Sequence, residues 1–363
     1  MFKRVSRRWD QWLEEHQAQF QDLKTMGIMF KRSSLSVVGA IIIALLVIVA
    51  AIGPSLAPFD PYKQELKTRL EPPSPYLTPI VITLLCSLVI GISNAYILSK
   101  HNYSLPKEGR QRKIVIVLIL LMAIFAGITI LQIRTATSQG EHIFGIDHLG
   151  RDIFSRVLHG ARISLKVAII ATAVASVVGV VVGIVSGYLG GKIDDLLMRI
   201  TDMFLAFPAL ILAMAVSASL GRGINNVMIA MAVVIWPRYA RLARGEALVH
   251  KQKEYIEAIR ALGASSKRII FLHLLPLCIS PIIVQMTLNM GGVILTAAGL
   301  GFIGFGAQPP SPEWGLMVAE GRTRIQFQWW ISTFPGLAIL IVVLGFNLLG
   351  DGIRDILDPK LRR

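Results

Sequence analysis

The chain has 363 residues and a formal net charge of +15, and 54% of its residues are hydrophobic whereas only 16% are charged. This composition excludes an ordinary water-soluble globular protein. Nucleic-acid binding is not indicated either, because the Lys and Arg residues lie in short connections between apolar runs. Such runs, about 20 residues long, recur along the chain and predict an all-α polytopic membrane protein.

The first 34 residues have aromatic and leucine side chains at helical spacing among basic residues. This pattern favours an amphipathic helix on the cytoplasmic surface, in contact with membrane lipids, over a frayed tail. The next run, 35–57, is too long for the apolar part of a cleavable signal peptide. It is predicted to be a signal anchor and the first transmembrane helix.

Eight membrane-spanning helices are predicted, at residues 35–57, 77–98, 113–133, 163–189, 202–220, 224–242, 277–305 and 330–350. Most of the 37 Lys and Arg residues lie on one side of the membrane if the N-terminus is cytoplasmic. Both termini are therefore predicted to be cytoplasmic, with 351–363 as a tail and 243–275 as the largest cytoplasmic loop.

Within that loop, the segment from Glu254 to Pro276 is charged and amphipathic, although apolar runs flank it. One apolar stripe is predicted from Tyr255, Ile259 and Leu262, and a second face from Glu254, Glu257, Ala258 and Ala261. A helix would stop at Gly263, because glycine accepts the left-handed conformation of a C-cap. The segment predicts either two short helices that project as a docking knob or a solvated linker.

Glu257-Ala258-Ile259, Gly263 and Leu275-Pro276 resemble the EAA motif of permease subunits in bacterial ABC importers. The family pattern is E-A-A, three residues, G, nine residues, I-x-L-P; this chain departs at Ile259 and His273 but keeps the spacing. In that family the motif forms the coupling helix, which inserts into a groove of the ATPase subunit. The resemblance implies a coupling role for Glu254, Tyr255, Glu257, Ala258, Ile259, Gly263, Ala264 and Pro276.

Four further stretches, 144–165, 194–210, 304–322 and 349–362, are similar to the C-type permease of dipeptide and oligopeptide importers. This resemblance implies a type I core of six transmembrane helices in the plasma (inner) membrane of a prokaryote. It also implies ATP-driven uptake of di- or oligopeptides, with nickel or oligosaccharides as the alternative cargo. The implied partners are a B-type permease subunit, one or two ABC ATPase subunits and an extracytoplasmic substrate-binding protein.

Residues 75–140 depart from the family pattern. They contain two additional apolar runs that flank the basic link 99–113, so an inserted transmembrane hairpin is predicted before the permease core, 141–350. The hairpin is either a lateral buttress packed on the first core helix or a docking site for another membrane subunit.

The sequence contains no phosphate-binding G-x-x-x-x-G-K-[ST] motif, and Gly190-Gly191-Lys192-Ile193 is its nearest approach. No catalytic or metal-ligand constellation has usable spacing. The chain is therefore predicted not to be an enzyme and to hold no cofactor, with ATP and magnesium bound by the partner ATPase. An ion-coupled secondary transporter is less favoured, since no buried acidic relay or pair of interrupted helices is evident.

Three further groups of residues have predicted roles. Ala171, Ala175, Gly179, Gly183 and Gly187 recur at every fourth position, which predicts close helix packing within the chain or against a partner permease. Pathway lining or interhelical hydrogen bonding is predicted for Gln285, Thr287, Asn289 and Thr296. Binding-protein contact or closure of a helix pair is predicted for Pro309, Pro310, Pro312, Glu313 and Trp314, and the same choice applies to Arg151, Asp152 and Arg156.

Overall fold

The computed structural model describes residues 34–100 and 109–357. This part of the chain is helical and contains no strand beyond an isolated bridge between Ile146 and Asp152. Its helices are α2 (Ser34–Leu56), α3 (Leu77–Lys100), α4 (Gly109–Ser138), α5 (Ile153–Leu189), α6 (Gly191–Ala206), α7 (Ala209–Leu220), α8 (Ile224–His250), α9 (Glu254–Ala261), α10 (Ser266–Arg268), α11 (Leu275–Ile303), α12 (Trp314–Gly321) and α13 (Trp330–Leu357). The predicted interfacial helix of residues 1–34 lies outside the described residues apart from Ser34, as do the last six residues of the predicted tail.

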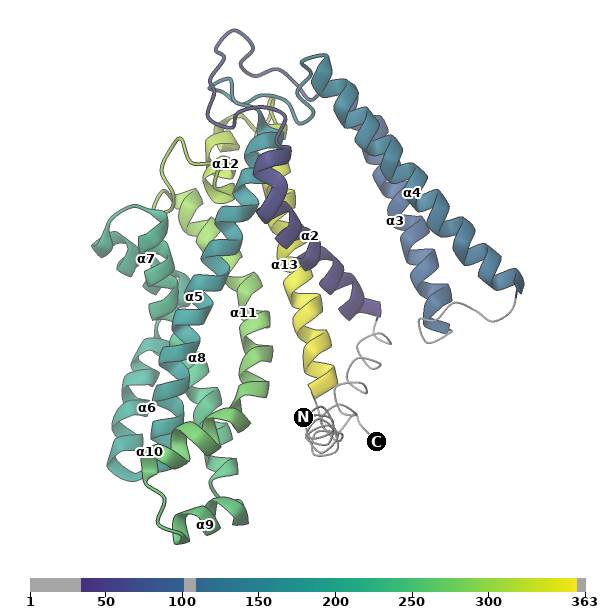
Figure 1. Cartoon of the computed structure of the whole chain (residues 1–363). Helices are drawn as coiled ribbons and strands as arrows, with labels where there is room; N and C mark the ends of the chain where they lie inside the picture. The colour runs from purple at the N-terminus through teal and green to yellow at the C-terminus, as the bar shows by residue number, and fades with distance from the viewer. Residues whose placement is uncertain (1–33, 101–108, 358–363) are drawn as a thin grey trace, which may run out of the picture.

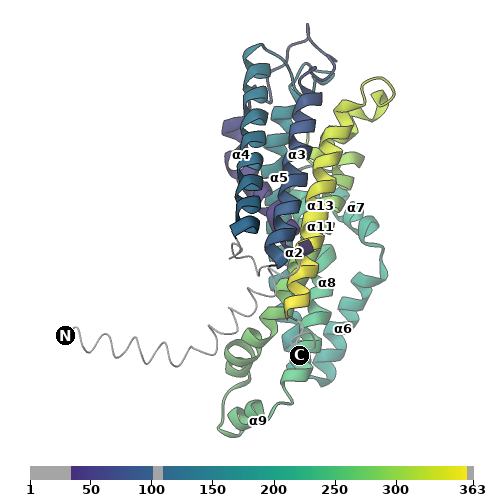
Figure 2. The ribbon, with the colours of Figure 1, turned by 90° about the vertical axis from the view of Figure 1, so that its right-hand side faces the viewer.

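The helices form an elongated bundle with two different ends. Figure 1 shows α9 beyond the other helices at one end, whereas α12 and the connections 57–76 and 139–152 lie at the opposite end. The second view agrees with this arrangement (Figure 2). These are called the α9 end and the α12 end below.

The longest helix, α5, packs along α8 through the predicted stripe of small residues. Added side-chain atoms at three of these positions would collide with α8: a Cβ at Gly179 would lie 2.6 Å from the Tyr239 Cβ, and one at Gly187 2.8 Å from the Arg244 carbonyl oxygen. Ala171 and Ala175 are also buried. The stripe therefore brings two helices of the same chain together, and the prediction of close packing within the chain is confirmed.

Helices occur at all eight predicted spanning positions, but they are not equally long and apolar. In the described part of the chain, five helices are long and apolar enough to cross a membrane, or six if α6 and α7 count as one broken span. Within α3 the apolar helix is the shorter stretch Leu77–Gly91. In α8, Asn225, Asn226, Arg238 and Arg241 interrupt the apolar sequence.

The prediction of one continuous span at 202–220 was wrong. Helix α6 ends at Ala206 and α7 begins at Ala209, and the two are bent by 94°. Pro208 explains the break, because the proline ring disfavours helical geometry in the preceding residue. Phe207 accordingly has an extended backbone, with φ −87° and ψ 139°.

The hairpin of α3 and α4 packs chiefly on itself. Between its helices the Thr129 hydroxyl donates to the Thr83 hydroxyl oxygen at 2.8 Å. A small cluster of Ile80, Ala136 and Ile143 joins the hairpin to the core near the α12 end. Below this cluster the hairpin diverges from α2, as Figure 1 shows. A buttress packed along the first core helix is therefore not what the described residues form.

The α5–α8 contact provides a test of the packing. Changing Gly183 to Ala places a Cβ 2.8 Å from the Ala243 Cβ and closer still to the Ala240 carbonyl oxygen. We expect Gly183→Ala to lower the free energy of unfolding by about 1–3 kcal/mol, as overpacking of a tight contact does. The melting temperature in detergent measures it.

The matched control is Gly245→Ala on α8, where a Cβ would meet no atom within 4 Å. Alanine favours helix over glycine by about 1 kcal/mol, so this variant should keep or raise the melting temperature. Equal melting temperatures of the two variants would contradict the close packing of α5 on α8.

Candidate functional site

Helix α9 is a short helix whose charges follow its dipole. Glu254 and Glu257 lie in its first turn and Arg260 in its last, where acidic and basic side chains respectively stabilise a helix. The helix is attached to the bundle by Ile256, which is fully buried, and by the half-buried Ile259. Eight residues are thus enough to form a helix because the bundle supplies part of its packing.

A glycine turn ends α9, as predicted. Gly263 has a φ of +84°, its N–H donates to the Arg260 carbonyl oxygen at 3.0 Å, and the Ala264 N–H donates to the Ile259 carbonyl oxygen at 3.3 Å. These two bonds form a Schellman motif, which requires a left-handed residue at this position. The Ser265 side chain then accepts from the Arg268 N–H and caps α10. The prediction of two short helices joined by a glycine turn is confirmed.

The predicted faces of α9 need a correction. Leu262 is 87% exposed and Tyr255 42% exposed, whereas Ile256, which the predicted stripe omitted, is buried. Ile259 faces the bundle, so it contributes less to the outer surface than its place in the motif implies. The surface that α9 presents outwards consists of Glu254, Tyr255, Glu257, Ala258, Ala261 and Leu262, all of them exposed.

Side chains connect this region to the end of α5. The Arg260 guanidinium carbon lies 5.5 Å from the ring centroid of Tyr188, the penultimate residue of α5. Just before α9, the Lys251 ammonium donates to the Gly187 carbonyl oxygen at 2.7 Å. Arg260, Lys251 and Tyr188 were not singled out from the sequence, because no local pattern reports contacts between such distant segments.

An ion pair fixes the neighbouring helices at the same end. The Arg244 guanidinium of α8 donates twice to the Asp194 carboxylate of α6, both at 2.6 Å, and the Ser186 hydroxyl of α5 donates to the same carboxylate. Two parallel bonds between Arg and a carboxylate are strong and directional. Asp194 therefore joins three helices directly beside the attachment of α9.

The connection from α10 to α11 is a π-helix, Ile269–Leu274. Its hydrogen bonds include the Leu275 N–H to the Ile270 carbonyl oxygen, one residue longer than an α-helical bond. Pro276 lies in the first turn of α11, where the missing N–H costs no hydrogen bond. π-Helical turns often occur at functional sites.

The predicted pathway residues form hydrogen bonds within α11. The Gln285 amide donates to the Asn289 side-chain oxygen at 3.0 Å, the Thr287 hydroxyl to the Ile283 carbonyl oxygen at 3.0 Å, and the Thr296 hydroxyl to the Gly292 carbonyl oxygen at 2.8 Å. Asn289 is buried and the other three are half-buried. Pathway lining stays a prediction for these residues. A separate apolar hollow of about 450 Å³ lies between α5, α6 and α8.

At the α12 end, Glu313 and Trp314 close a helix pair. The Glu313 carboxylate accepts the Gly315 and Leu316 N–H groups and caps α12, and the Trp314 indole donates to the Val157 carbonyl oxygen at 3.0 Å. Both side chains are buried, so their predicted contact with a binding protein needs correction. Pro309 and Pro310 are exposed, and for them that contact stays a prediction.

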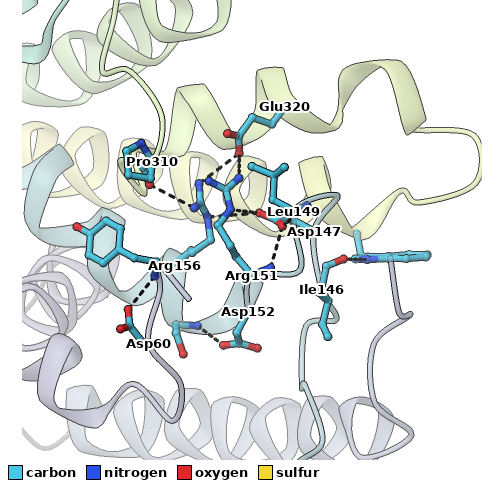
Figure 3. A network of polar contacts seen from close by, with 12 residues as sticks. Asp60, Ile146, Asp147, Leu149, Arg151, Asp152, Arg156, Pro310 and Glu320 are labelled. Carbon is cyan, nitrogen blue, oxygen red and sulfur yellow. Dashed lines mark hydrogen bonds and ion pairs between the residues drawn. The ribbon is translucent and has the colours of Figure 1, made fainter. Parts of the chain in front are cut away.

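Arg151 and Arg156, both 0% exposed, belong to a buried ion-pair network. Arg151 donates to Asp147 at 2.6 Å and to Glu320 at 2.8 Å, and Arg156 donates to Glu320 at 3.2 Å. Figure 3 shows the guanidinium groups lying between the two carboxylates. Asp152 caps α5 by accepting the Ser155 N–H. The three residues therefore have structural partners within the chain.

Asp147, His148 and Glu320 also lie close enough together to be considered as metal ligands. Two arginines already neutralise both carboxylates, however, and a cation there would be repelled by the buried guanidinium groups. These residues therefore fit an ion-pair network and not a metal centre.

Two family descriptions match the chain. Residues 179–363 match the binding-protein-dependent transport system inner membrane component, and residues 23–73 match the N-terminal TM domain of oligopeptide transport permease C. The predicted hairpin lies between the two matched segments. Its status as an insertion stays a prediction.

Curated relatives have names that agree with this family. A probable D,D-dipeptide transport system permease protein of Escherichia coli is 48% identical over 255 residues, which are 68% of this chain and 86% of the relative. A dipeptide transport system permease protein of Alkalihalophilus pseudofirmus is 46% identical over 69% of this chain and 84% of the relative. A glutathione transport system permease protein of Shigella flexneri is 54% identical over 61% of this chain and 73% of the relative.

Among solved structures, the MetNI methionine ABC transporter in inward facing conformations is similar at 18% identity and a TM-score of 0.45. The match covers 56% of this chain and 96% of that chain.

The buried ion-pair network predicts a large effect of removing one carboxylate. Glu320→Ala would leave two buried guanidinium groups short of a partner, so we expect the free energy of unfolding to fall by about 3–5 kcal/mol. Thermal unfolding in detergent measures the loss. Glu65→Ala is the control, because it removes the carboxylate of the exposed Lys63–Glu65 pair and should change little. Equal stability of the two variants would contradict the burial of the network.

The surroundings of His148 predict that the stability of the folded protein depends on pH. Burial lowers the pKa of His148 below its ordinary value of 6.5, and Arg151 and Arg324 lower it further against the opposing effect of Asp147 and Glu320. The unfolded chain then binds a proton more readily than the folded protein, so stability falls as the pH drops from about 6.5 through the folded-state pKa. We expect His148→Gln to reduce the difference between melting temperatures at pH 7.5 and pH 5.5. An unchanged difference would contradict this role.

Proposed function

Since the chain belongs to the family of binding-protein-dependent transport system inner membrane components, we propose that it imports di- or oligopeptides together with a B-type permease subunit. Its relatives are permease subunits of ABC importers, and the chain is a multi-pass membrane permease of this kind. ATPase and substrate-binding subunits are its partners in such a system. The named cargoes of the relatives are all short peptides, which supports a peptide cargo here.

The exposed surface of α9 is the observation that carries the proposal. This water-facing helix leaves Leu262 87% exposed and Tyr255 42% exposed, so both side chains are accessible to a partner. Glu254 and Glu257 flank it with acidic groups. We propose that this surface, together with the Gly263 turn, inserts into a groove of the ATPase subunit.

The two ends of the bundle then have separate partners. The α9 end faces the cytoplasm, because the ATPase must bind nucleotide there, and the α12 end faces outwards. Exposed Pro309 and Pro310 at the α12 end are in a position to contact the binding protein, held by the buried cap of Glu313. The relatives come from bacteria, which supports a prokaryotic plasma membrane.

The mechanism requires that ATPase binding distinguishes two packings of the bundle. A partner shifts such an equilibrium only through contacts that differ between the two states. Nucleotide binding and hydrolysis change the ATPase, and α9 conveys that change to the permease. The exposed carboxylates and apolar side chains of α9 provide the contact, and the bundle performs no chemical step of its own.

Gly263→Val tests the proposal. Its φ of +84° is strongly unfavourable for a β-branched residue, so the turn should be lost while the membrane helices are retained. We expect normal insertion, at least tenfold less radiolabelled dipeptide uptake in cells, and less ATPase subunit co-purifying in mild detergent.

Ser266→Val is the matched control, since it introduces the same side chain at an exposed helical position three residues later. It should retain uptake and the ATPase. Normal uptake by Gly263→Val, or a wild-type complex that contains no ATPase, would overturn the proposed function.

A further inference from the structure

Helix α9 is joined to the membrane bundle along two routes that differ in their structure. One runs through side chains to the end of α5, and the other runs along the chain through α10 and the π-helix to α11. We propose that α5 receives the displacement of α9 during transport, with Arg260 and Tyr188 as positioning residues. This inference rests on the proposed function, because it assumes that α9 binds the ATPase.

The route to α5 consists of direct contacts. Arg260 lies over the Tyr188 ring at 5.5 Å, the geometry in which a guanidinium is attracted to an aromatic face. Lys251, between α8 and α9, binds the Gly187 carbonyl oxygen at 2.7 Å. Lys251, just before α9, and Arg260, in its last turn, thus hold the helix against two successive residues of α5, Gly187 and Tyr188.

The residues of α5 that receive these contacts are themselves held in place. Tyr188 is 8% exposed. A Cβ at Gly187 would lie 2.9 Å from the Ala247 Cβ of α8, so the α5 backbone packs closely against α8 at this position. Ser186 binds Asp194, which is in turn held by Arg244. A displacement of Arg260 therefore acts on packed helices and not on a loose chain end.

The route to α11 combines the chain connection with apolar packing. It passes through the Gly263 turn, the three residues of α10 and the π-helix Ile269–Leu274. Ile256 of α9 belongs to the same buried cluster as Ile269, Ile270 and Leu274 of the π-helix. Helix α9 therefore contacts both neighbours, through apolar side chains at the π-helix and through the charged side chain of Arg260 at the end of α5.

Helix α5 also reaches the opposite end of the bundle. Its 37 residues span about 55 Å at 1.5 Å per residue. It begins at Ile153, directly after its cap Asp152, and contains Arg156 of the buried ion-pair network. One helix therefore connects the α9 attachment to the network beside the proposed binding-protein surface.

The experiment measures peptide transported per ATP hydrolysed, in proteoliposomes that contain the assembled complex and its binding protein. The variants are Arg260→Gln, Tyr188→Leu, the double variant, and Tyr188→Phe, which keeps the aromatic ring. Arg260 is exposed, so Arg260→Gln should not disturb folding. Lys192→Gln, at an exposed position of α6, is the control for loss of a basic residue at the same end.

We expect Arg260→Gln and Tyr188→Leu each to lower the transport ratio about three- to tenfold, with the ATPase still bound. The double variant should be no worse than either single variant, because both remove one interaction. Tyr188→Phe and Lys192→Gln should behave as wild type. If the Tyr188→Leu complex fails to assemble, the transport ratio of Arg260→Gln is the test, and Tyr188→Phe is the variant of Tyr188 compared with it.

An unchanged ratio in Arg260→Gln, with the ATPase bound and wild-type transport intact, would overturn the inference and leave the proposed function standing. Additive losses in the double variant would also overturn it, since the two side chains would then act separately. A wild-type complex that lacks an ATPase would instead overturn the proposed function itself.

Discussion

The close contact between α5 and α8 determines where the functional groups of this protein lie. Glycines on α5 allow its backbone to approach the α8 backbone, with Gly183 opposite Ala240 and Gly187 opposite Arg244. In lipid, where apolar side chains gain little from burying themselves against one another, such close packing is a principal source of helix association. Because α8 leads directly into α9, the same contact fixes the position from which α9 projects.

Charged groups are buried at one end of the bundle, and an apolar side chain is exposed at the other. At the α12 end, Arg151 and Arg156 are buried and neutralised by Asp147 and Glu320, so charge is used to hold segments distant in sequence together. At the α9 end, apolar Leu262 is exposed and the carboxylates of Glu254 and Glu257 are solvated. The charged side chains of the first arrangement are paired within the chain, whereas the apolar and acidic side chains of the second are exposed.

The sequence predicted those features that depend on local chemistry. Gly263 was recognised because few other residues accept its backbone conformation, and the small residues of α5 because they recur at a helical interval. The break before Pro208 had the same kind of signal, a proline within an apolar run, which the prediction of a continuous span overlooked. The buried face of α9 was mistaken because eight residues allow more than one apolar stripe, and only the bundle shows that Ile256 is covered.

Contacts between distant segments could not be predicted in this way. Arg151 and Glu320 are separated by 169 positions and Lys251 and Gly187 by 64, and no local pattern relates them. The sequence identified each charged residue, but its partner depends on how α5, α8 and α12 pack. The site was therefore predictable in its surface residues and its turn, and not in the contacts that attach it to the bundle.

The α3–α4 hairpin is attached to the α12 end of the bundle. The hairpin joins the core through Ile143, with Phe144 and Phe154 packed around it, all near the start of α5. It makes no attachment to the α9 end in the described residues (Figure 1). A segment joined only at the α12 end can follow the start of α5 without constraining Tyr188, Asp194 or α9. The attachment of the hairpin therefore avoids the described contacts that connect α9 to the rest of the bundle.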